Sequence, residues 1–504
     1  RQKEIAIRMA VGAARSRIAR QLLVESIMLA CCGGTAGLVL AAWLGSALLR
    51  MLPSSSTSLI LSSALNLTVL GFTFAVSLGT GALFGLLPSW QAAQSAPALT
   101  LKAEATTVAG GAAHTRIRKG LVVGQVAISL VLVVAAVLFA RSLYNLRAQY
   151  PGFRSSHLLT FAIEPSLNGY NDARSLALFH ELQQRLGNLP GVQSVSAAEA
   201  GLLDGDDSIS TITVEGYTPG DREDMNPNTN NVGAGFFSTL GVPVLMGRAF
   251  DERDTASSAK VAVLNEKAWH YWFKEQNPLG RHIGFGGDKK PQIEIVGVVK
   301  DFKSQSLRDE VPRFVYTPYT QDQNLGQMTW FVRTTQDPAA LAASARAVVK
   351  QLDDHLPIFK VRTMEVTISD SLFTERMIAV LSVFFAAVAA ALAAVGLYGV
   401  MAYTVARRTG EIGIRMALGA TRERVVWLVM REVLFMAAVG IAIALPLAIL
   451  MNRTLKSQVY GISTADPVTL AAGMVALALV AGLSGFLPAL KASRIDPMRA
   501  LRLE

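Results

Sequence analysis

The chain has 504 residues, of which 51% are hydrophobic and only 17% are charged, whereas about 25% of the residues of an average soluble domain are charged. This composition excludes an ordinary soluble protein and indicates a membrane protein. A single hydrophobic core stops growing at roughly 250 to 300 residues, so the chain is expected to form several structural units.

The net charge of +10 is unevenly distributed along the chain. Residues 151–370 carry 21 Lys and Arg against 27 Asp and Glu, whereas the other residues carry 26 against 10. The basic excess therefore lies in the hydrophobic regions and their short connectors, as the positive-inside rule expects. Because these basic residues flank apolar segments and no set of stacking aromatics accompanies them, we expect no nucleic-acid partner.

Six stretches are long and apolar enough to cross a bilayer, which needs roughly 20 mostly apolar helical residues. In chain order they are 21–49, 66–88, 119–140, 377–404, 425–451 and 468–490. The first carries one charge, Glu25, near its start, where an interfacial position is tolerable. Gly33 with Gly37, and Gly81 with Gly85, are small residues spaced four apart, and this spacing predicts close packing between helices.

The short connectors predict how these spans are oriented, because the Lys and Arg of short loops determine membrane topology. Residues 1–20, 89–119 and 405–424 and the C-terminal tail are rich in Lys and Arg and are expected to be cytoplasmic. The connectors 52–65 and 452–467 have at most two basic residues and are expected to face outward. Connectors expected to be cytoplasmic and connectors expected to face outward alternate consistently over all six spans, and this alternation places the acidic region 151–370 outside the cell.

The chain contains an internal repeat. RQKEIAIRMAVGAARSRIARQLLVE, Arg1–Glu25, aligns without a gap with RTGEIGIRMALGATRERVVWLVMRE, Arg408–Glu432, and a second block from Gly85 aligns with one from Gly485. Both copies have the same orientation, so they are parallel repeats. Two spans and an outer domain precede the second copy. By symmetry we expect the same elements before Arg1, in a protein of about 800 residues with eight spans and two outer domains.

The segment TGEIGIRMALGATRERV, which precedes the span 425–451, predicts a short amphipathic helix that ends at Gly419. Its apolar positions are Ile412, Met416 and Leu418, and its charged positions are Glu411, Arg415 and Arg422. Two interpretations are open: the helix is a socket for a soluble protein, or it anchors to anionic lipid headgroups. Glu411 and its repeat counterpart Glu4 bind lipid phosphates poorly and favour the protein partner.

The pattern EIxIRxAxGAxRxRI/V, the ending DPMRALRLE and the large outer region between two spans resemble the MacB/FtsX-type permeases of ABC transporters. The duplication is similar to the long orphan permeases that carry two such halves on one polypeptide, here with the N-terminal part missing. The resemblance covers essentially the whole chain. It implies two coupling helices that dock on ATPase subunits, one with Glu4, Arg8, Gly12, Arg15 and Arg17, the other with Glu411, Arg415, Gly419, Arg422 and Arg424.

The resemblance also implies how the chain is divided. Residues 1–118 would be the C-terminal part of a first FtsX-like half, 119–140 a membrane helix, 141–376 an extracytoplasmic MacB-like domain and 377–504 the second FtsX-like half. The expected fold class is a polytopic α-helical membrane protein with an α+β outer domain. Its two subdomains would be a βαβ-rich one formed from both ends of the segment and an inserted one, which we place at about 225–320.

The outer region itself predicts an α+β fold. The expected strands are 158–163, 192–198, 211–216, 293–302, 313–319 and 328–334, and the expected helices are 172–189, 265–275 and about 338–354. Asp172 is the expected N-cap of the first of these helices. Trp269, Tyr271 and Trp272 could form a partner-binding patch, but we expect them to belong to the core.

The sequence predicts no catalytic or metal site. Its six histidines are dispersed without metal-ligand spacing, and none lies in a nucleophile motif. The acidic runs Asp204–Asp207 and Asp251–Asp254 are expected to be solvated turns rather than calcium sites. No G-x-x-x-x-G-K-[ST] occurs, and the glycines and lysines between 284 and 290 lack the spacing that cradles phosphate. We therefore expect no enzyme activity and no cofactor on this chain, with ATP bound and hydrolysed by a separate subunit.

Together these features predict a permease of the bacterial inner membrane that couples ATP hydrolysis by a separate ATPase to movement of its outer domain, for export, efflux or mechanotransmission. The alternative is a non-transporting regulator of an extracytoplasmic envelope enzyme. The expected partners are ABC-type ATPase subunits at the cytoplasmic face and the lipid bilayer, with a periplasmic or outer-membrane protein as a further candidate.

Overall fold

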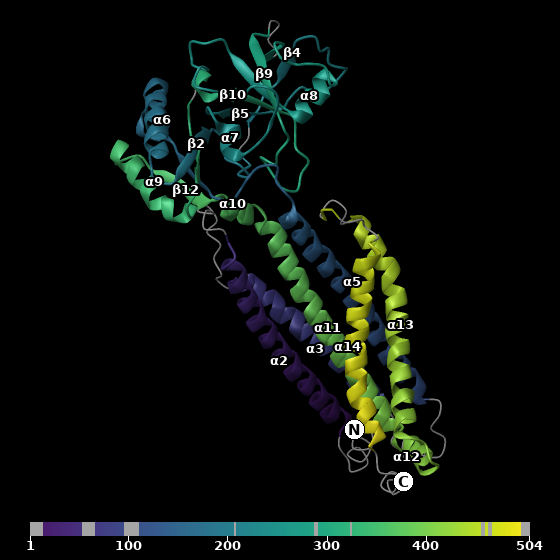
Figure 1. Ribbon diagram of the computed structural model, residues 1–504. Coiled ribbons are helices and arrows are strands. Elements are labelled where there is room, and N and C mark those ends of the chain that lie inside the picture. Colours follow the sequence, from purple (N-terminus) through teal and green to yellow (C-terminus); the bar gives the residue numbers. More distant parts are fainter. Residues whose placement is uncertain are drawn as a thin grey trace. The chain divides into compact units, whose positions relative to one another are not determined.

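The computed structural model describes residues 14–52, 66–94, 110–205, 208–286, 291–322, 325–454, 459–461 and 466–494. The chain forms two compact units, one from Arg1–Arg141 with Met377–Glu504 and the other from Ser142–Arg376 (Figure 1). The two boundaries between these units, after Arg141 and after Arg376, lie inside helices rather than loops, within α5 (Gly110–Ala148) and α11 (Phe373–Arg407). Each of these two helices therefore contributes residues to both units.

The first unit consists of helices. Besides parts of α5 and α11 it contains α2 (Arg15–Leu49), α3 (Leu67–Gln94), α12 (Thr409–Ala417), α13 (Arg422–Thr454) and α14 (Pro467–Ser493). Within the described ranges, five helices are long and apolar enough to cross a membrane, in α2, α5, α11, α13 and α14. The remaining expected span, 66–88, lies in α3, whose apolar described stretch, Leu67–Leu83, is shorter than a span.

The sequence repeat is visible in where these helices begin. α2 and α13 begin at corresponding positions of the repeat, Arg15 and Arg422. α2 packs against α3 in the first copy, where a Cβ added to Gly81 would lie 2.7 Å from Ala30 Cβ, so the close packing expected at Gly81 is confirmed. Within the part of the chain that the structure describes, no atom lies within 4 Å of a Cβ added to Gly33 or Gly37, so the packing expected at these two glycines stays a prediction.

In the second copy, α13 and α14 pack with α5, α11 and α12 around one apolar core. Two glycines allow this approach. A Cβ added to Gly440 of α13 would lie 2.6 Å from Val126 Cγ1, and one added to Gly473 of α14 would lie 2.8 Å from Val134 Cγ2. Because Val126 and Val134 both belong to α5, this helix lies directly against both α13 and α14.

The second unit contains a sheet in which 12 strands are present among the residues that the structure describes. They are β1 (Leu158–Ile163), β2 (Val192–Ala198), β3 (Ser208–Ile209), β4 (Ile212–Val214), β5 (Asn228–Val232), β6 (Val244–Gly247), β7 (Val261–Asn265), β8 (His282–Phe285), β9 (Ile293–Val299), β10 (Phe314–Pro318), β11 (Met328–Thr334) and β12 (Ile358–Thr363). The strand order is β12-β1-β11-β2-β5-β10-β7-β9-β8-β4, with β3 beside β5 and β6 beside β9.

One part of this sheet comes from both ends of the segment. β12, β1, β11 and β2 pair antiparallel, and α6 (Asp172–Gly187) and α9 (Pro338–Leu352) pack side by side on them (Figure 1). Their shared core contains Phe161, Phe179 and Trp330, all fully buried. This helical layer over antiparallel strands, together with the membrane-length helices, confirms the expected fold class.

The other part of the sheet comes from the middle of the segment and includes the parallel pairs β5 with β10 and β7 with β9. The helices α7 (Phe236–Leu240) and α8 (Glu266–Phe273) contribute to its cores. β4 pairs with β8, so this middle set begins before residue 225, where we placed the start of the inserted subdomain. The limits of that subdomain stay a prediction. A short helix, α10 (Met364–Ser371), follows β12 and precedes α11.

Two local expectations are corrected by the structure. The N-cap of α6 is Asn171 and not Asp172, because Asn171 Oδ1 accepts the N–H of Arg174 at 2.9 Å. Asp172 lies in the first turn, and its carboxylate instead accepts the N–H of Leu325. In α8, Trp272 is buried in the core as expected, and Trp269 packs partly against it. Tyr271 is 40% exposed, so its assignment to the core is wrong.

Candidate coupling site

The second copy of the repeated motif forms a separate short helix at the end of α11. α11 ends at Arg407, and only Arg408 separates it from α12. α12 ends at Ala417, and Gly419 follows with φ +91°, a left-handed conformation that a residue with a side chain adopts at a cost of roughly 1–2 kcal/mol. The expected end of the helix at Gly419 is therefore confirmed.

The side chains of α12 divide into a packed side and an exposed side. Ile412 is 2% exposed and belongs to the core of the helical unit, and Met416 packs against that core. Ile414 and Leu418 are exposed, Leu418 to 83%. The expectation that Leu418 lies on the packed side is wrong, because it follows the last residue of the helix and leaves the helical face. The exposed side of α12 is therefore apolar as well as charged.

A chain of five charged side chains connects α12 to its neighbours. Arg415 Nη2 donates to Glu411 Oε1 at 2.6 Å within α12, and Arg408 Nε lies 3.9 Å from Glu411 Oε2. Arg408 Nη1 also lies 3.7 Å from Glu432 Oε2 on α13. Lys119 of α5 forms an ion pair with the other oxygen of Glu432. Cationic and anionic groups thus alternate from α12 to α5.

The candidate residues of the two copies have different outcomes. In the second copy, the segment from α12 to the first turn of α13 contains all five candidates: Glu411, Arg415, Gly419, Arg422 and Arg424. The four charged side chains among them are exposed. In the first copy, Glu4, Arg8 and Gly12 lie outside the described residues. Arg15 begins α2, and Arg17 is exposed in its first turn.

Sequence reasoning missed Lys119, Arg408 and Glu432 as members of this site. A signal for two of them was present, because Arg1 and Glu25 hold the repeat positions of Arg408 and Glu432. Lys119 has no such signal and is brought to Glu432 only by the tertiary packing of α5 against α13.

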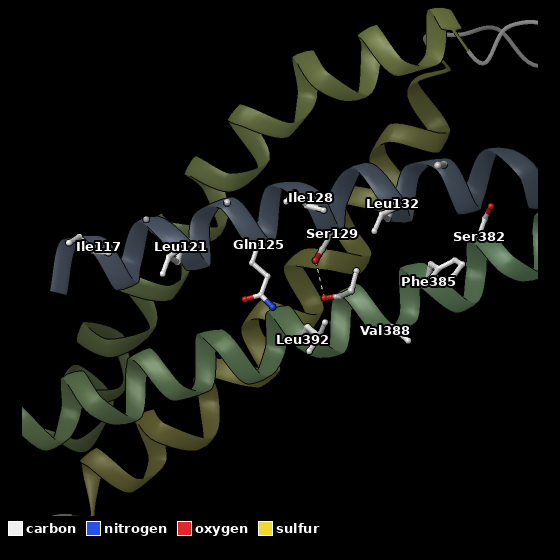
Figure 2. Close-up of a pocket in the computed structure, with 14 residues that line it drawn as sticks. Ile117, Leu121, Gln125, Ile128, Ser129, Leu132, Ser382, Phe385, Val388 and Leu392 are labelled. Carbon is white, nitrogen blue, oxygen red and sulfur yellow. Dashed lines mark hydrogen bonds between the residues drawn. The ribbon is translucent and has the colours of Figure 1, made fainter. Parts of the chain in front are cut away.

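An apolar pocket of about 920 Å³ lies between α5 and α11 within the helical unit (Figure 2). Its lining includes Leu121, Ile128, Leu132, Phe385 and Leu392. Ser129 Oγ donates to the carbonyl of Ala389 at 2.9 Å and thereby joins the two helices across the pocket. The lining carries no charged side chain, so the pocket suits an apolar group.

A polar cavity of about 340 Å³ lies in the outer unit and is lined mainly by residues of the middle strands. Glu199 and Asp322 line it, and both accept hydrogen bonds from the same amide, Asn231 Nδ2, which lies 2.8 Å from Glu199 Oε2. Burial, together with repulsion from Asp322, raises the pKa of Glu199 despite the hydrogen bond from Asn231.

The acidic runs of the outer unit are engaged by the chain's own cations. Asp204 is nearly buried and pairs with Lys360 and Arg362, and Asp254 is held by both guanidinium nitrogens of Arg248 at 2.7 Å. The expectation of solvated turns is therefore wrong for these two carboxylates. Among the residues described in the structure, no group of three or more His, Cys, Asp or Glu is arranged to hold a metal ion.

Comparison with known proteins identifies two family models along the chain. The model described as FtsX-like permease C-terminal matches residues 1–97 and 383–497. The model described as MacB-like periplasmic core domain matches residues 120–351. The two models interleave, with the periplasmic core domain placed between the two FtsX-like segments.

Curated relatives match this chain at low identity. The Macrolide export ATP-binding/permease protein MacB of Campylobacter jejuni is 27% identical over 364 residues, which cover 68% of this chain and 53% of that protein. The Pyoverdine export ATP-binding/permease protein PvdT of Pseudomonas syringae is 28% identical over 271 residues, 52% of this chain and 40% of that protein. The chain thus spans about half the length of the curated relatives it matches.

Among solved structures, the periplasmic region of MacB from Actinobacillus actinomycetemcomitans is 21% identical, with a TM-score of 0.31, and the match covers 45% of this chain and 98% of that one. The extracellular domain of YknZ, a noncanonic ABC-type transporter from Gram-positive bacteria, is 18% identical with a TM-score of 0.27, over 40% of this chain and 100% of that one.

Proposed function

Because the chain belongs to the MacB/FtsX-type ABC transporter permeases, we propose that it is the membrane permease of a bacterial export system in which a separate ATPase moves its extracytoplasmic domain. The names of the relatives, macrolide export and pyoverdine export, support export as the direction. Those names also include ATP binding, and the phosphate-cradling motif G-x-x-x-x-G-K-[ST] does not occur in these 504 residues. In this proposal another subunit supplies ATP hydrolysis.

The observation that carries the proposal is the exposed side of α12. Ile414 and Leu418 are exposed beside Glu411 and Arg415, while Ile412 fixes the helix to the core. Exposed apolar side chains bordered by charges are typical of a surface that docks a protein. A helix that only lay on anionic headgroups would gain nothing from Glu411, whose charge the headgroups repel.

Movement of α12 has a direct path toward the outer unit. α12 follows α11 after a single residue, and α11 runs without a break across the division between Arg376 and Met377. A helix transmits displacement along its length because its backbone hydrogen bonds keep it rigid. This continuity supports mechanotransmission as the way in which ATP hydrolysis acts on the extracytoplasmic domain.

The chain is a membrane protein with an extracytoplasmic segment, and we place it in the bacterial inner membrane with residues 141–376 outside the cytoplasm. Arg-rich connectors near α12 support a cytoplasmic position for this helix. A periplasmic or outer-membrane partner of the outer domain would complete an export path across the envelope.

The test is purification of the full-length protein from native membranes in mild detergent, followed by an assay of the eluate for ATP hydrolysis. A variant with both Glu4→Lys and Glu411→Lys reverses a charge in each copy of the motif. Glu252→Lys, an exposed charge of the outer unit, is the matched control. We expect wild type and control to retain an ATPase. The double variant should retain at least about tenfold less ATPase activity, which corresponds to about 1.4 kcal/mol of docking free energy.

Two results would contradict the proposal. If wild-type protein that is folded retains no ATPase, transport loses its support and the regulator of an envelope enzyme becomes the better explanation. If the double variant retains as much ATPase as the control, an ATPase binds but not through the repeated motif.

A further inference from the structure

Three charged side chains form a cluster where α5, α12 and α13 meet within the helical unit. The carboxylate of Glu432 on α13 is shared between two cations, with one oxygen paired to Lys119 of α5 and the other 3.7 Å from Arg408 Nη1. The Glu432 side chain is 18% exposed, so water screens these contacts less than it screens the exposed pair of Glu411 and Arg415.

The place of Arg408 in the chain gives this cluster its significance. Arg408 is the only residue between α11 and α12, so it moves with α12, whose Glu411 also lies 3.9 Å from its guanidinium. α12 is therefore connected to α11 by the peptide chain and to α5 by the charges of Arg408, Glu432 and Lys119. α5 and α11 are the two helices that contain the divisions between the units of the chain.

We propose that Glu432 is a positioning residue that fastens α12 to α5, so that a displacement of α12 reaches both helices that continue into the outer unit. The proposal rests on the proposed function, in which an ATPase displaces α12. Without Glu432, displacement of α12 would pass directly only into α11, and α5 would receive it indirectly, through its contacts with α11 such as the Ser129–Ala389 hydrogen bond.

Apolar packing holds α12 to the helical core only through Ile412 and Met416. The close contact between α5 and α13, at Val126 and Gly440, lies two helical turns beyond Lys119 and involves no atom of α12. Replacing Glu432 by a neutral residue would leave the positive charges of Lys119 and Arg408 facing each other, which drives α12 away from α5.

The internal repeat supports a specific role for this carboxylate. Glu25 holds the repeat position of Glu432, and Arg1 that of Arg408, so the same two charges recur at the same spacing on both copies. α13 carries this acid, directly after Arg431, between apolar residues on both sides, where a charge is costly unless it is paired.

The experiment compares the full-length protein in lipid nanodiscs with the variants Glu432→Gln, Lys119→Met and the two combined. Lys119→Arg is the conservative rescue, because it keeps the charge. Arg116→Met is the matched control, since Arg116 is an exposed charge one turn earlier on α5. Three quantities are measured: the amount of bound ATPase, the hydrogen exchange of α12 amides without ATP, and the change in exchange of the outer unit on adding ATP and vanadate.

We expect Glu432→Gln and Lys119→Met to bind the ATPase within about twofold of wild type, since the exposed side of α12 is intact. In both variants, the ATP-dependent change in hydrogen exchange of the outer unit should be at least about fivefold smaller than in wild type. Their α12 amides should exchange at least about fivefold faster, while α14 amides exchange at the wild-type rate, which shows that the bundle is folded. Lys119→Arg and Arg116→Met should behave as wild type. The combined variant should be no worse than Glu432→Gln alone, because Lys119 acts through Glu432.

The proposal is overturned if α12 amides exchange at the wild-type rate in Glu432→Gln, or if the effects of Glu432→Gln and Lys119→Met add in the combined variant. Failure of the proposed function is recognised separately. If wild-type protein binds no ATPase, the docking proposal fails, and the exchange of α12 amides still decides whether Glu432 holds α12.

Discussion

Arg362 of β12 joins two carboxylates of the outer unit in a largely buried cluster. One guanidinium nitrogen pairs with Asp204, and another lies 3.5 Å from Asp370 Oδ2 at the end of α10. The three side chains are only 13%, 10% and 20% exposed. Removing one partner of a fully buried ion pair costs about 3–5 kcal/mol. Because water still reaches the cluster and Lys360 still pairs with Asp204, we expect Arg362→Met to cost about 2–3 kcal/mol.

This cost converts into a measurable loss of thermal stability. For a unit of 150–250 residues, 1 kcal/mol shifts the melting temperature by about 2–4 °C, so Arg362→Met should lower that of the outer unit by about 5–10 °C. The assay is limited proteolysis of the full-length protein over a temperature series, with cleavage scored within Ser142–Arg376. Lys350→Met is the control, because Lys350 of α9 forms an ion pair with Asp354, which follows the helix. Both side chains are more than 60% exposed, and such a pair is worth about 0–1 kcal/mol. Equal shifts for the two variants would refute the argument that burial of the cluster sets its energy.

Three further predictions concern single residues. Glu199→Gln should stabilise the outer unit at pH 7 and leave its stability unchanged near pH 4. The pKa of Glu199 is raised in the folded state, so the folded unit loses stability as the pH rises from the unfolded pKa through the folded pKa of this carboxyl. Equal effects of the substitution at both pH values would contradict this. Asn265→Ala should cost about 2–4 kcal/mol in urea unfolding, because this buried amide caps α8 and also bonds Phe314 N–H and the Pro312 carbonyl. Gly419→Ala should strain the end of α12 by about 1 kcal/mol and speed the exchange of its last amides.

The sequence predicted the strands of the outer unit where buried apolar residues form an uninterrupted run. β1 and β11 lie at the expected residues, because each is buried over most of its length and is correspondingly rich in apolar residues. β2 also lies at the expected residues, although only its second half is buried. β5, with the sequence NTNNV, was missed for the opposite reason. Its Asn230 is buried, and its amide bonds both the N–H and the carbonyl of Ala200. A side chain that replaces backbone pairing makes a polar segment stable inside a sheet, and no periodicity reveals this.

The candidate coupling site was predictable only in its local part. The charge pattern and Gly419 gave the position and the end of α12, because helix formation and termination depend on neighbouring residues. The partners of Glu432 depend on tertiary packing, since Lys119 lies 313 residues away in the chain. The repeat preserves Glu432 and Arg408 as Glu25 and Arg1, so comparison of the two copies marks the carboxylate even though it does not identify what binds it.

The repeat also allows a prediction about packing in the first copy. Continuing the alignment without a gap places Gly33 of α2 at the position of Gly440 of α13. Gly440 lies against α5 at Val126, whereas no atom lies within 4 Å of a Cβ added to Gly33. If symmetry extends to packing, an apolar helix covers Gly33 in the assembled protein. Gly33→Leu should then cost about 1–3 kcal/mol by overpacking, the same cost that we expect of Gly440→Leu. Gly45→Leu, on the same helix with equally open space, should be neutral. Thermal unfolding of the protein in nanodiscs measures all three, and a neutral Gly33→Leu would show that the two copies are packed differently.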